Sequence, residues 1–183
     1  QISFPHMSNA FVTVKALLDD LGADYVIPPY NNREALELGT RHVPEMACLP
    51  LKITLGSLIQ GFRQGADTVL MAGGCGPCRF GYYCEMQREI LKDMGCEMDM
   101  IVLDLPNGDV GEFIRRVKKL AGGLNVPRIL KAVINAARIS VMVDELESLS
   151  FRVRPREIDK GATDRIYSSF LKKAREAKGS AEI

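Results

Sequence analysis

The sequence predicts an α/β fold: a flavodoxin- or Rossmann-like, mostly parallel sheet with helices on both faces, followed by a helical segment. Two observations predict it. Over residues 1–108, short apolar runs alternate with stretches whose apolar residues recur every three or four positions. After residue 108 the spacing is helical almost throughout. Strands that alternate with helices favour a parallel sheet covered on both faces.

Four apolar runs are the predicted strands. They cover residues 2–4, 25–27, 68–72 and 100–105, and each is followed directly by a proline or a glycine. The third, Thr-Val-Leu-Met-Ala, has the clearest pattern of a buried strand. Because ligands of such sheets bind beyond the carboxyl ends of the strands, the residues after each run are the first candidates for a functional site.

Helical spacing predicts the remaining elements, and Ser8 or Asn9 is expected to cap the first of them. The first has Phe11, Val14, Leu18 and Leu21 at helical spacing and stops at Gly22. Further helices are predicted over about 34–38, 51–65, 81–94, 127–149 and 162–178, and one with Val110, Phe113, Ile114 and Val117 is broken at Gly122-Gly123. Residues 151–153 are a weak candidate for one further strand. The predicted domains are an α/β cluster-binding domain over 1–108 and a helical continuation over 109–183. We expect the chain to be the front portion of a longer polypeptide.

Composition narrows the classes of protein that the chain can represent. It has 183 residues, of which 46% are hydrophobic and 26% charged, which suits a folded domain rather than a disordered chain. The apolar runs are far shorter than the ~20 residues of a membrane-spanning helix, and the net charge of +1 does not suit a nucleic-acid binder. We therefore expect neither a membrane nor a nucleic acid as partner.

The small net charge hides two regions of opposite sign. Residues 1–110 carry 8 basic and 14 acidic side chains, whereas residues 111–183 carry 16 basic and 9 acidic ones. One interpretation is that solvated helix faces attract each other within the molecule. The other is that the basic region forms a docking face for an anionic ligand or an acidic partner.

Five cysteines are the main chemical clue, and their odd number does not suit a framework of disulfides. A reducing, cytoplasmic location would leave the thiols free for metal binding, redox chemistry or packing. Cys75-Gly-Pro-Cys78 lies between a predicted strand and a predicted helix, where a helix N-terminus stabilises thiolates. Arg79 adds a positive charge beside Cys78.

Four interpretations of these cysteines remain open. Cys75 and Cys78 match the thioredoxin tetrapeptide, but Gly73-Gly74 replaces the aromatic residue that precedes it there. A zinc site would have only half of its tetrahedron, since His6 and His42 lack the spacing of a ligand pair. Packing in the core accounts best for Cys96 and plausibly for Cys84. An iron–sulfur cluster would draw Cys48, Cys75 and Cys78 from two loops at one edge of the sheet.

Several segments resemble a known family. They are Phe4-Pro-His-Met7, Cys48-Leu-Pro-Leu-Lys52, Gly65-Ala-Asp-Thr-Val-Leu-Met-Ala-Gly-Gly-Cys-Gly-Pro-Cys-Arg-Phe-Gly-Tyr-Tyr83 and, more weakly, Arg154-Pro-Arg-Glu157 and Lys160-Gly-Ala-Thr-Asp164. They resemble the subunits of 2-hydroxyacyl-CoA dehydratases and benzoyl-CoA reductases, in the branch associated with CoA-enzyme activases. The resemblance implies an oxygen-sensitive 4Fe–4S protein of anaerobic metabolism, an ATP-dependent activase as partner and an acyl-CoA as substrate.

The resemblance also sets the expected site and function. The cluster ligands are expected to be Cys48, Cys75 and Cys78, with Arg79 tuning the cluster through its charge. Relatives use three cysteines, one of them late in the chain, so either Cys75 or Cys78 could be a non-ligand. We expect the electron-accepting subunit of an activase-driven CoA-thioester dehydratase or reductase, with no catalytic residue assigned and oligomerisation left open. The alternatives are a non-catalytic scaffold that carries a cluster or docks the activase, and a dithiol redox protein.

Overall fold

The computed structural model describes residues 1–74, 77–103, 110–120, 122 and 125–183. The chain forms two compact units, each built from two separate segments. The first unit comprises Gln1–Met7 and Ala23–Gly123, and the second comprises Ser8–Gly22 and Leu124–Ile183.

The first unit is built on a parallel sheet of four strands in the order β2-β1-β3-β4. The strands are β1 (Ile2–Ser3), β2 (Tyr25–Val26), β3 (Thr68–Ala72) and β4 (Asp99–Leu103). Val69, Leu70 and Met71 are consecutive and all buried, as expected of a strand covered on both faces. The predicted α/β fold, a parallel sheet with helices followed by a helical segment, is therefore confirmed.

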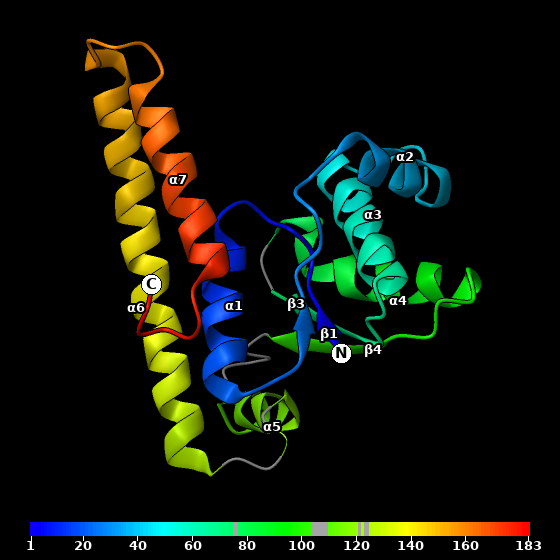
Figure 1. Cartoon of the computed structure of the whole chain (residues 1–183). Helices are drawn as coiled ribbons and strands as arrows, with labels where there is room; N and C mark the ends of the chain where they lie inside the picture. Colours follow the sequence, from blue (N-terminus) through cyan, green and yellow to red (C-terminus); the bar gives the residue numbers. More distant parts are fainter. Residues whose placement is uncertain (75–76, 104–109, 121, 123–124) are drawn as a thin grey trace. The chain divides into compact units, whose positions relative to one another are not determined.

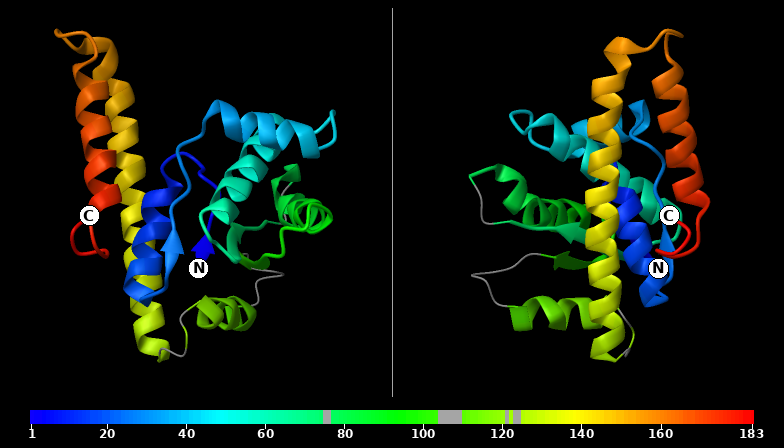
Figure 2. Two further views of the ribbon diagram at one scale, coloured as in Figure 1. Left: turned by 45° about the vertical axis from the view of Figure 1, so that its right-hand side comes forward. Right: turned by 90° about the vertical axis from the view of Figure 1, so that its left-hand side faces the viewer.

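The helices of this unit are α2 (Arg33–His42), α3 (Leu49–Arg63), α4 (Tyr83–Asp93), which follows the short 3-10 helix η1 (Arg79–Tyr82), and α5 (Val110–Leu120). Helices α3, α4 and α5 contact the strands, and α2 packs on α3. Helices α3 and α4 lie on one side of the sheet, and α5 lies beside β4 on the other (Figures 1 and 2). Leu55 and Leu58 of α3 pack with Val69 and Met71 of β3 in the core.

Helices α2 and α3 approach each other so closely that only glycine fits at two positions. A Cβ atom on Gly39 would lie 1.7 Å from the backbone carbonyl oxygen of Lys52. A Cβ atom on Gly56 would lie 1.8 Å from the backbone carbonyl oxygen of Ala35. This contact fixes α3, whose first turn follows Cys48, against its neighbour.

The second unit is helical. It contains α1 (Ala10–Leu21), the long α6 (Val126–Val153), the 3-10 helix η3 (Arg154–Arg156) and α7 (Ala162–Glu176). Helices α6 and α7 form a hairpin, and α1 lies along α6 (Figure 1). No helix in the described part of the chain is both long and apolar enough to span a membrane.

Three features differ from the sequence-based expectations. Helix α5 belongs to the first unit and α1 to the second, so the division does not fall at residue 108, because α1 packs its apolar face on α6. The strand candidate over residues 151–153 is wrong, since these residues complete the last turn of α6. Asn9 precedes α1 but makes no side-chain capping bond; its amide donates to the Tyr167 hydroxyl instead, at 2.5 Å.

We expect Gly56→Ala to lower the free energy of unfolding by about 1–3 kcal/mol, because the added methyl group meets the backbone of Ala35. Inside a helix the same change is ordinarily stabilising, by about 1 kcal/mol. Urea denaturation followed by circular dichroism measures the effect. The control is Gly74→Ala, where a Cβ atom would meet nothing within 4 Å. A Gly56→Ala protein as stable as the wild type would contradict this packing.

Candidate functional site

Two cysteines border elements that start at the carboxyl edge of the sheet. Cys48 has an extended backbone (φ −66°, ψ 149°) and immediately precedes α3, whose first turn contains Pro50. Cys78 follows β3 and immediately precedes η1, which leads into α4. A proline suits the first turn of a helix because the N–H group that it lacks would have no partner there. Local sequence thus places each thiol where a helix begins.

Tyr83, the first residue of α4, joins these two segments. Its hydroxyl oxygen lies 2.5 Å from Sγ of Cys48, although its side chain is almost fully buried. Burial raises the pKa of Tyr83 to about 12, and the hydrogen bond with Cys48 acts in the same direction. The same hydrogen bond lowers the pKa of the Cys48 thiol, with a smaller contribution from the charge of Arg79. The raised pKa keeps the proton on the tyrosine oxygen, and the hydrogen bond favours the thiolate form of Cys48.

Cys78 and Arg79 affect the hydrogen-bonded pair of Cys48 and Tyr83 through their charges. Both side chains are exposed, and the negative charge of a Cys78 thiolate contributes to the raised pKa of Tyr83. Phe80 packs edge-on against the Tyr83 ring, with 5.4 Å between the centroids, and so holds η1 beside α4. Cys48 and Cys78 thus both act on Tyr83, and the charge of Arg79 acts on Cys48. Cys75, the third predicted ligand, lies outside the described residues.

Cys84 and Cys96 have a different environment. Their exposed fractions are 6% and 9%, and both belong to the hydrophobic core of the first unit. Burial raises the pKa of both thiols, so they stay protonated at neutral pH. The prediction that Cys96 is a packing residue is confirmed, and Cys84 is also a core residue.

A buried hydrogen-bond chain supports the contact between Tyr83 and Cys48. Gln87, one turn after Tyr83, donates from Nε2 to the Thr54 hydroxyl at 2.9 Å. Thr54 in turn donates to the carbonyl oxygen of Pro50 at 2.8 Å. The chain ties α4 to the first turn of α3, which is the turn that follows Cys48. It therefore fixes the separation of the two groups at the site.

Sequence reasoning missed Tyr83, Gln87 and Thr54 as site residues. Helical spacing with Met86 and Ile90 places Tyr83 on an apolar face of its helix, and its burial in the core agrees with that. The available signal was a polar glutamine four residues after Tyr83, because residues at that spacing share one face of a helix. A buried polar side chain needs a partner, and here the partner lies on the helix that begins at Cys48.

Two other residues weighed from the sequence have structural roles. His6 is buried, its backbone N–H donates to the Ser57 hydroxyl at 3.1 Å, and its ring lies 4.7 Å from that of Tyr30. Lys52 donates from Nζ to the carbonyl oxygen of Glu45 at 3.0 Å. Both contacts stabilise loops next to the sheet.

The donor set fits a thiolate-bound cluster in part. Two of the three predicted ligands are described: Cys48 bonds to Tyr83, and Cys78, from a different segment, acts on the same tyrosine through its charge. Among the residues that the structure describes, no group of three or more histidine, cysteine, aspartate or glutamate side chains is placed to hold a metal ion. A third thiolate would have to come from Cys75. Thiolates are the usual ligands of iron–sulfur clusters.

Comparisons of the chain with protein-family models, with curated proteins and with solved structures found no match. The resemblance of residues 2–105 to the dehydratase and reductase subunits therefore stays a prediction. The candidate site rests on the geometry around Tyr83.

We expect Tyr83→Phe to move the alkylation of Cys48 to higher pH in the metal-free protein. The reason is that the tyrosine hydrogen bond lowers the pKa of the thiol, so its loss returns that pKa toward the ordinary range. Rates of reaction with iodoacetamide across a pH series, resolved by peptide mass spectrometry, measure the shift. Tyr82→Phe is the matched control, because this neighbouring tyrosine is 65% exposed. Identical Cys48 profiles in the wild type and Tyr83→Phe would rule out the hydrogen bond.

Proposed function

We propose that the chain is an iron–sulfur protein that holds a 4Fe–4S cluster through Cys48, Cys75 and Cys78. We further propose that it is the electron-accepting subunit of an activase-driven CoA-thioester dehydratase or reductase. The observation that carries the first proposal is that Cys48 bonds to the Tyr83 hydroxyl, while Cys78, whose charge acts on the same tyrosine, precedes the helical turn that leads into it. The second rests on the resemblance of residues 2–105 to such subunits.

The residues around the site would have distinct tasks. The lowered pKa of Cys48 favours the thiolate, which is the form that binds a metal ion. Tyr83 withdraws electron density from that sulfur through its hydrogen bond, and Arg79 adds a compensating positive charge. A bound cluster would supply a one-electron store whose potential depends on such hydrogen bonds and charges. The exposure of Cys78 leaves this side of the site open to a partner or a substrate.

The partners follow from the resemblance. An ATP-hydrolysing activase would deliver the electron, and an acyl-CoA thioester would receive it. The protein would act in the cytoplasm of an anaerobically growing cell, where an oxygen-sensitive cluster survives. A scaffold that carries the cluster without chemistry would dock the same activase but would not bind the thioester.

A dithiol redox centre formed by Cys75 and Cys78 is the second candidate. The exposure of the Cys78 thiol just before η1 favours it, because disulfide exchange needs an accessible thiolate. The two functions differ in their use of Cys48. A cluster needs this residue as a ligand, whereas a disulfide between Cys75 and Cys78 does not.

Iron binding is tested by strictly anaerobic purification of the full chain, with iron and acid-labile sulfide analysis. We expect about four iron and four sulfide per chain, and an EPR signal after reduction. Cys48→Ser and Cys78→Ser should each lower the iron content strongly, because each removes a ligand thiolate. Cys96→Ala should keep it, since Cys96 packs in the core.

A protein that is colourless and free of iron under these conditions would end the cluster proposal. Full iron retention in Cys48→Ser would remove Cys48 from the site. Loss of disulfide-exchange activity in Cys78→Ser but not in Cys48→Ser would support the dithiol centre instead. For a protein that does hold iron, a change in the EPR signal on addition of an acyl-CoA would separate the enzyme from the scaffold.

A further inference from the structure

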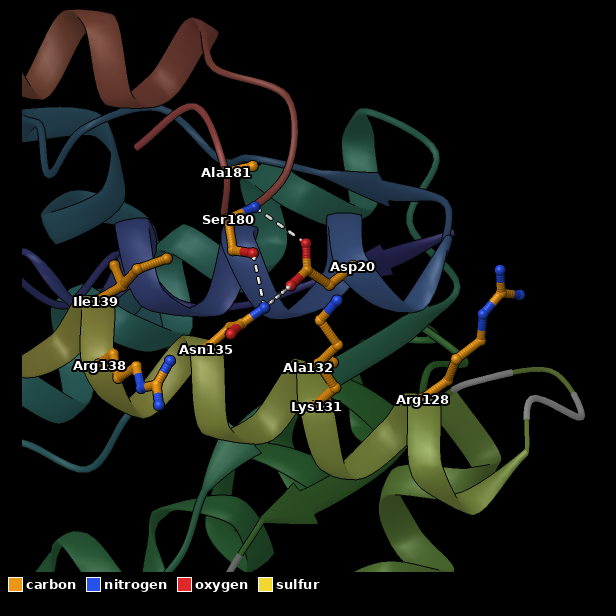
Figure 3. A pocket seen from close by; sticks show the side chains of 9 residues that line it. All are labelled: Asp20, Arg128, Lys131, Ala132, Asn135, Arg138, Ile139, Ser180 and Ala181. Carbon is orange, nitrogen blue, oxygen red and sulfur yellow. Dashed lines mark hydrogen bonds between the residues drawn. The ribbon is translucent and has the colours of Figure 1, made fainter.

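A cavity of about 610 Å³ lies in the second unit, between α6 and the residues that follow α7 (Figure 3). Its size is that of a typical site for a small molecule, about 300–1,000 Å³. Arg128, Lys131 and Arg138 line it from α6, and Asp20 and Ser180 line it from the opposite side. The cavity belongs to a different unit from the cysteines, so its role is independent of the thiol site.

The three basic side chains lie along one face of α6. Together with Asn135 they recur at intervals of three or four residues, which places them in a row on the helix. All three are exposed, and within the described part of the chain none of them forms an ion pair. Like charges at this spacing repel each other by a few tenths of a kcal/mol. Lys131 interacts through its charge with Asp20, so among the described residues that line the cavity the row presents an excess of positive charge.

Asp20 is the single acidic side chain in the cavity, and its carboxylate is already engaged. It accepts hydrogen bonds from the Ser180 backbone N–H at 3.0 Å and from Asn135 Nδ2 at 3.1 Å (Figure 3). Burial opposes its ionisation, but the bonds from Ser180 and Asn135 outweigh burial and keep the pKa of Asp20 below its ordinary value. The carboxylate thus holds the C-terminal residues in place.

The wall opposite α6 is anchored at further points. The backbone N–H of Gly179 donates to Asp19 at 2.9 Å, and Lys15, which is buried, donates to the carbonyl oxygen of Ala177. Asn135 also donates to the Ser180 hydroxyl at 3.0 Å. These bonds join residues 177–180 to α1 and α6. Hydrogen bonds to two helices therefore hold the wall of the cavity in place.

We propose that this cavity binds a small ligand that carries two or more phosphate groups. Three cations against one engaged carboxylate leave a net positive charge, which a polyanion would neutralise. Arg128 and Arg138 are ten residues apart on α6, or about 15 Å along the helix, so one phosphate group cannot reach both. Arginine side chains match phosphate oxygens with paired hydrogen bonds, and Lys131 between them adds a point charge.

Titration calorimetry of the full chain with inorganic tripolyphosphate, at low ionic strength, tests the proposal. We expect saturable binding that weakens as salt is added. Lys131→Gln and Arg138→Gln should each weaken it about tenfold, the effect of losing one charge-assisted contact. Lys172→Gln is the matched control, because it removes the same charge from an exposed position on α7 outside the cavity. Its affinity should equal that of the wild type.

Asp20→Asn gives a test in the opposite direction. It removes the negative charge from the cavity, so the affinity for tripolyphosphate should rise, a result that mere loss of structure would not produce. The proposal fails if the wild type shows no saturable binding. It also fails if Lys172→Gln weakens binding as much as Lys131→Gln, because the ligand would then be attracted by the positive charge of the whole protein and not by the cavity. An ATP titration distinguishes the sources: tighter binding than tripolyphosphate indicates a nucleotide, and equal affinity indicates the phosphate chain alone.

Discussion

The hydrogen bond between Tyr83 and Cys48 is the interaction on which the candidate site depends. It joins the first residue of α4 to the residue before α3, and so connects two segments that are distant in sequence. Burial keeps the proton on the tyrosine oxygen, and the bond lowers the pKa of the Cys48 thiol. The bond between Gln87 and Thr54 holds the same two helices one turn deeper in the core.

The sheet and the helix packing explain why these groups meet. The strands of a parallel sheet all end at one edge, and β3 leads from that edge into the segment that holds Cys78 and Tyr83. Helix α3 connects back to the start of β3, so its first turn, which follows Cys48, lies at the same edge. Helix α3 is held by its glycine contacts with α2, which leave no room for a side chain at Gly39 or Gly56. Cys48 therefore stands at the start of a helix whose position is fixed from both sides, by α2 and by the core.

Much of the fold could be predicted because strands buried on both faces consist of continuous apolar runs. The structure has β3 at Thr68–Ala72, as predicted. The partner of α1 could not be predicted, because helical spacing shows which face is buried but not against which element. The contact of Tyr83 with Cys48 was hidden for a similar reason: a buried tyrosine fits an apolar face, and only the fold reveals what its hydroxyl meets.

The excess of basic residues after position 110 was visible in the sequence. The placement of three of these residues along one face of α6, opposite an engaged carboxylate, could not be seen there.

The central claim is that Cys48 and Cys78 face one shared site, and a short bifunctional thiol reagent tests it most directly. In the metal-free Cys75→Ser protein, dibromobimane should link Cys48 to Cys78, as identified by peptide mass spectrometry. The link should not form with Cys84 or Cys96, which are buried in the core. Modification of Cys48 and Cys78 as separate single adducts, with no link between them, would contradict the account.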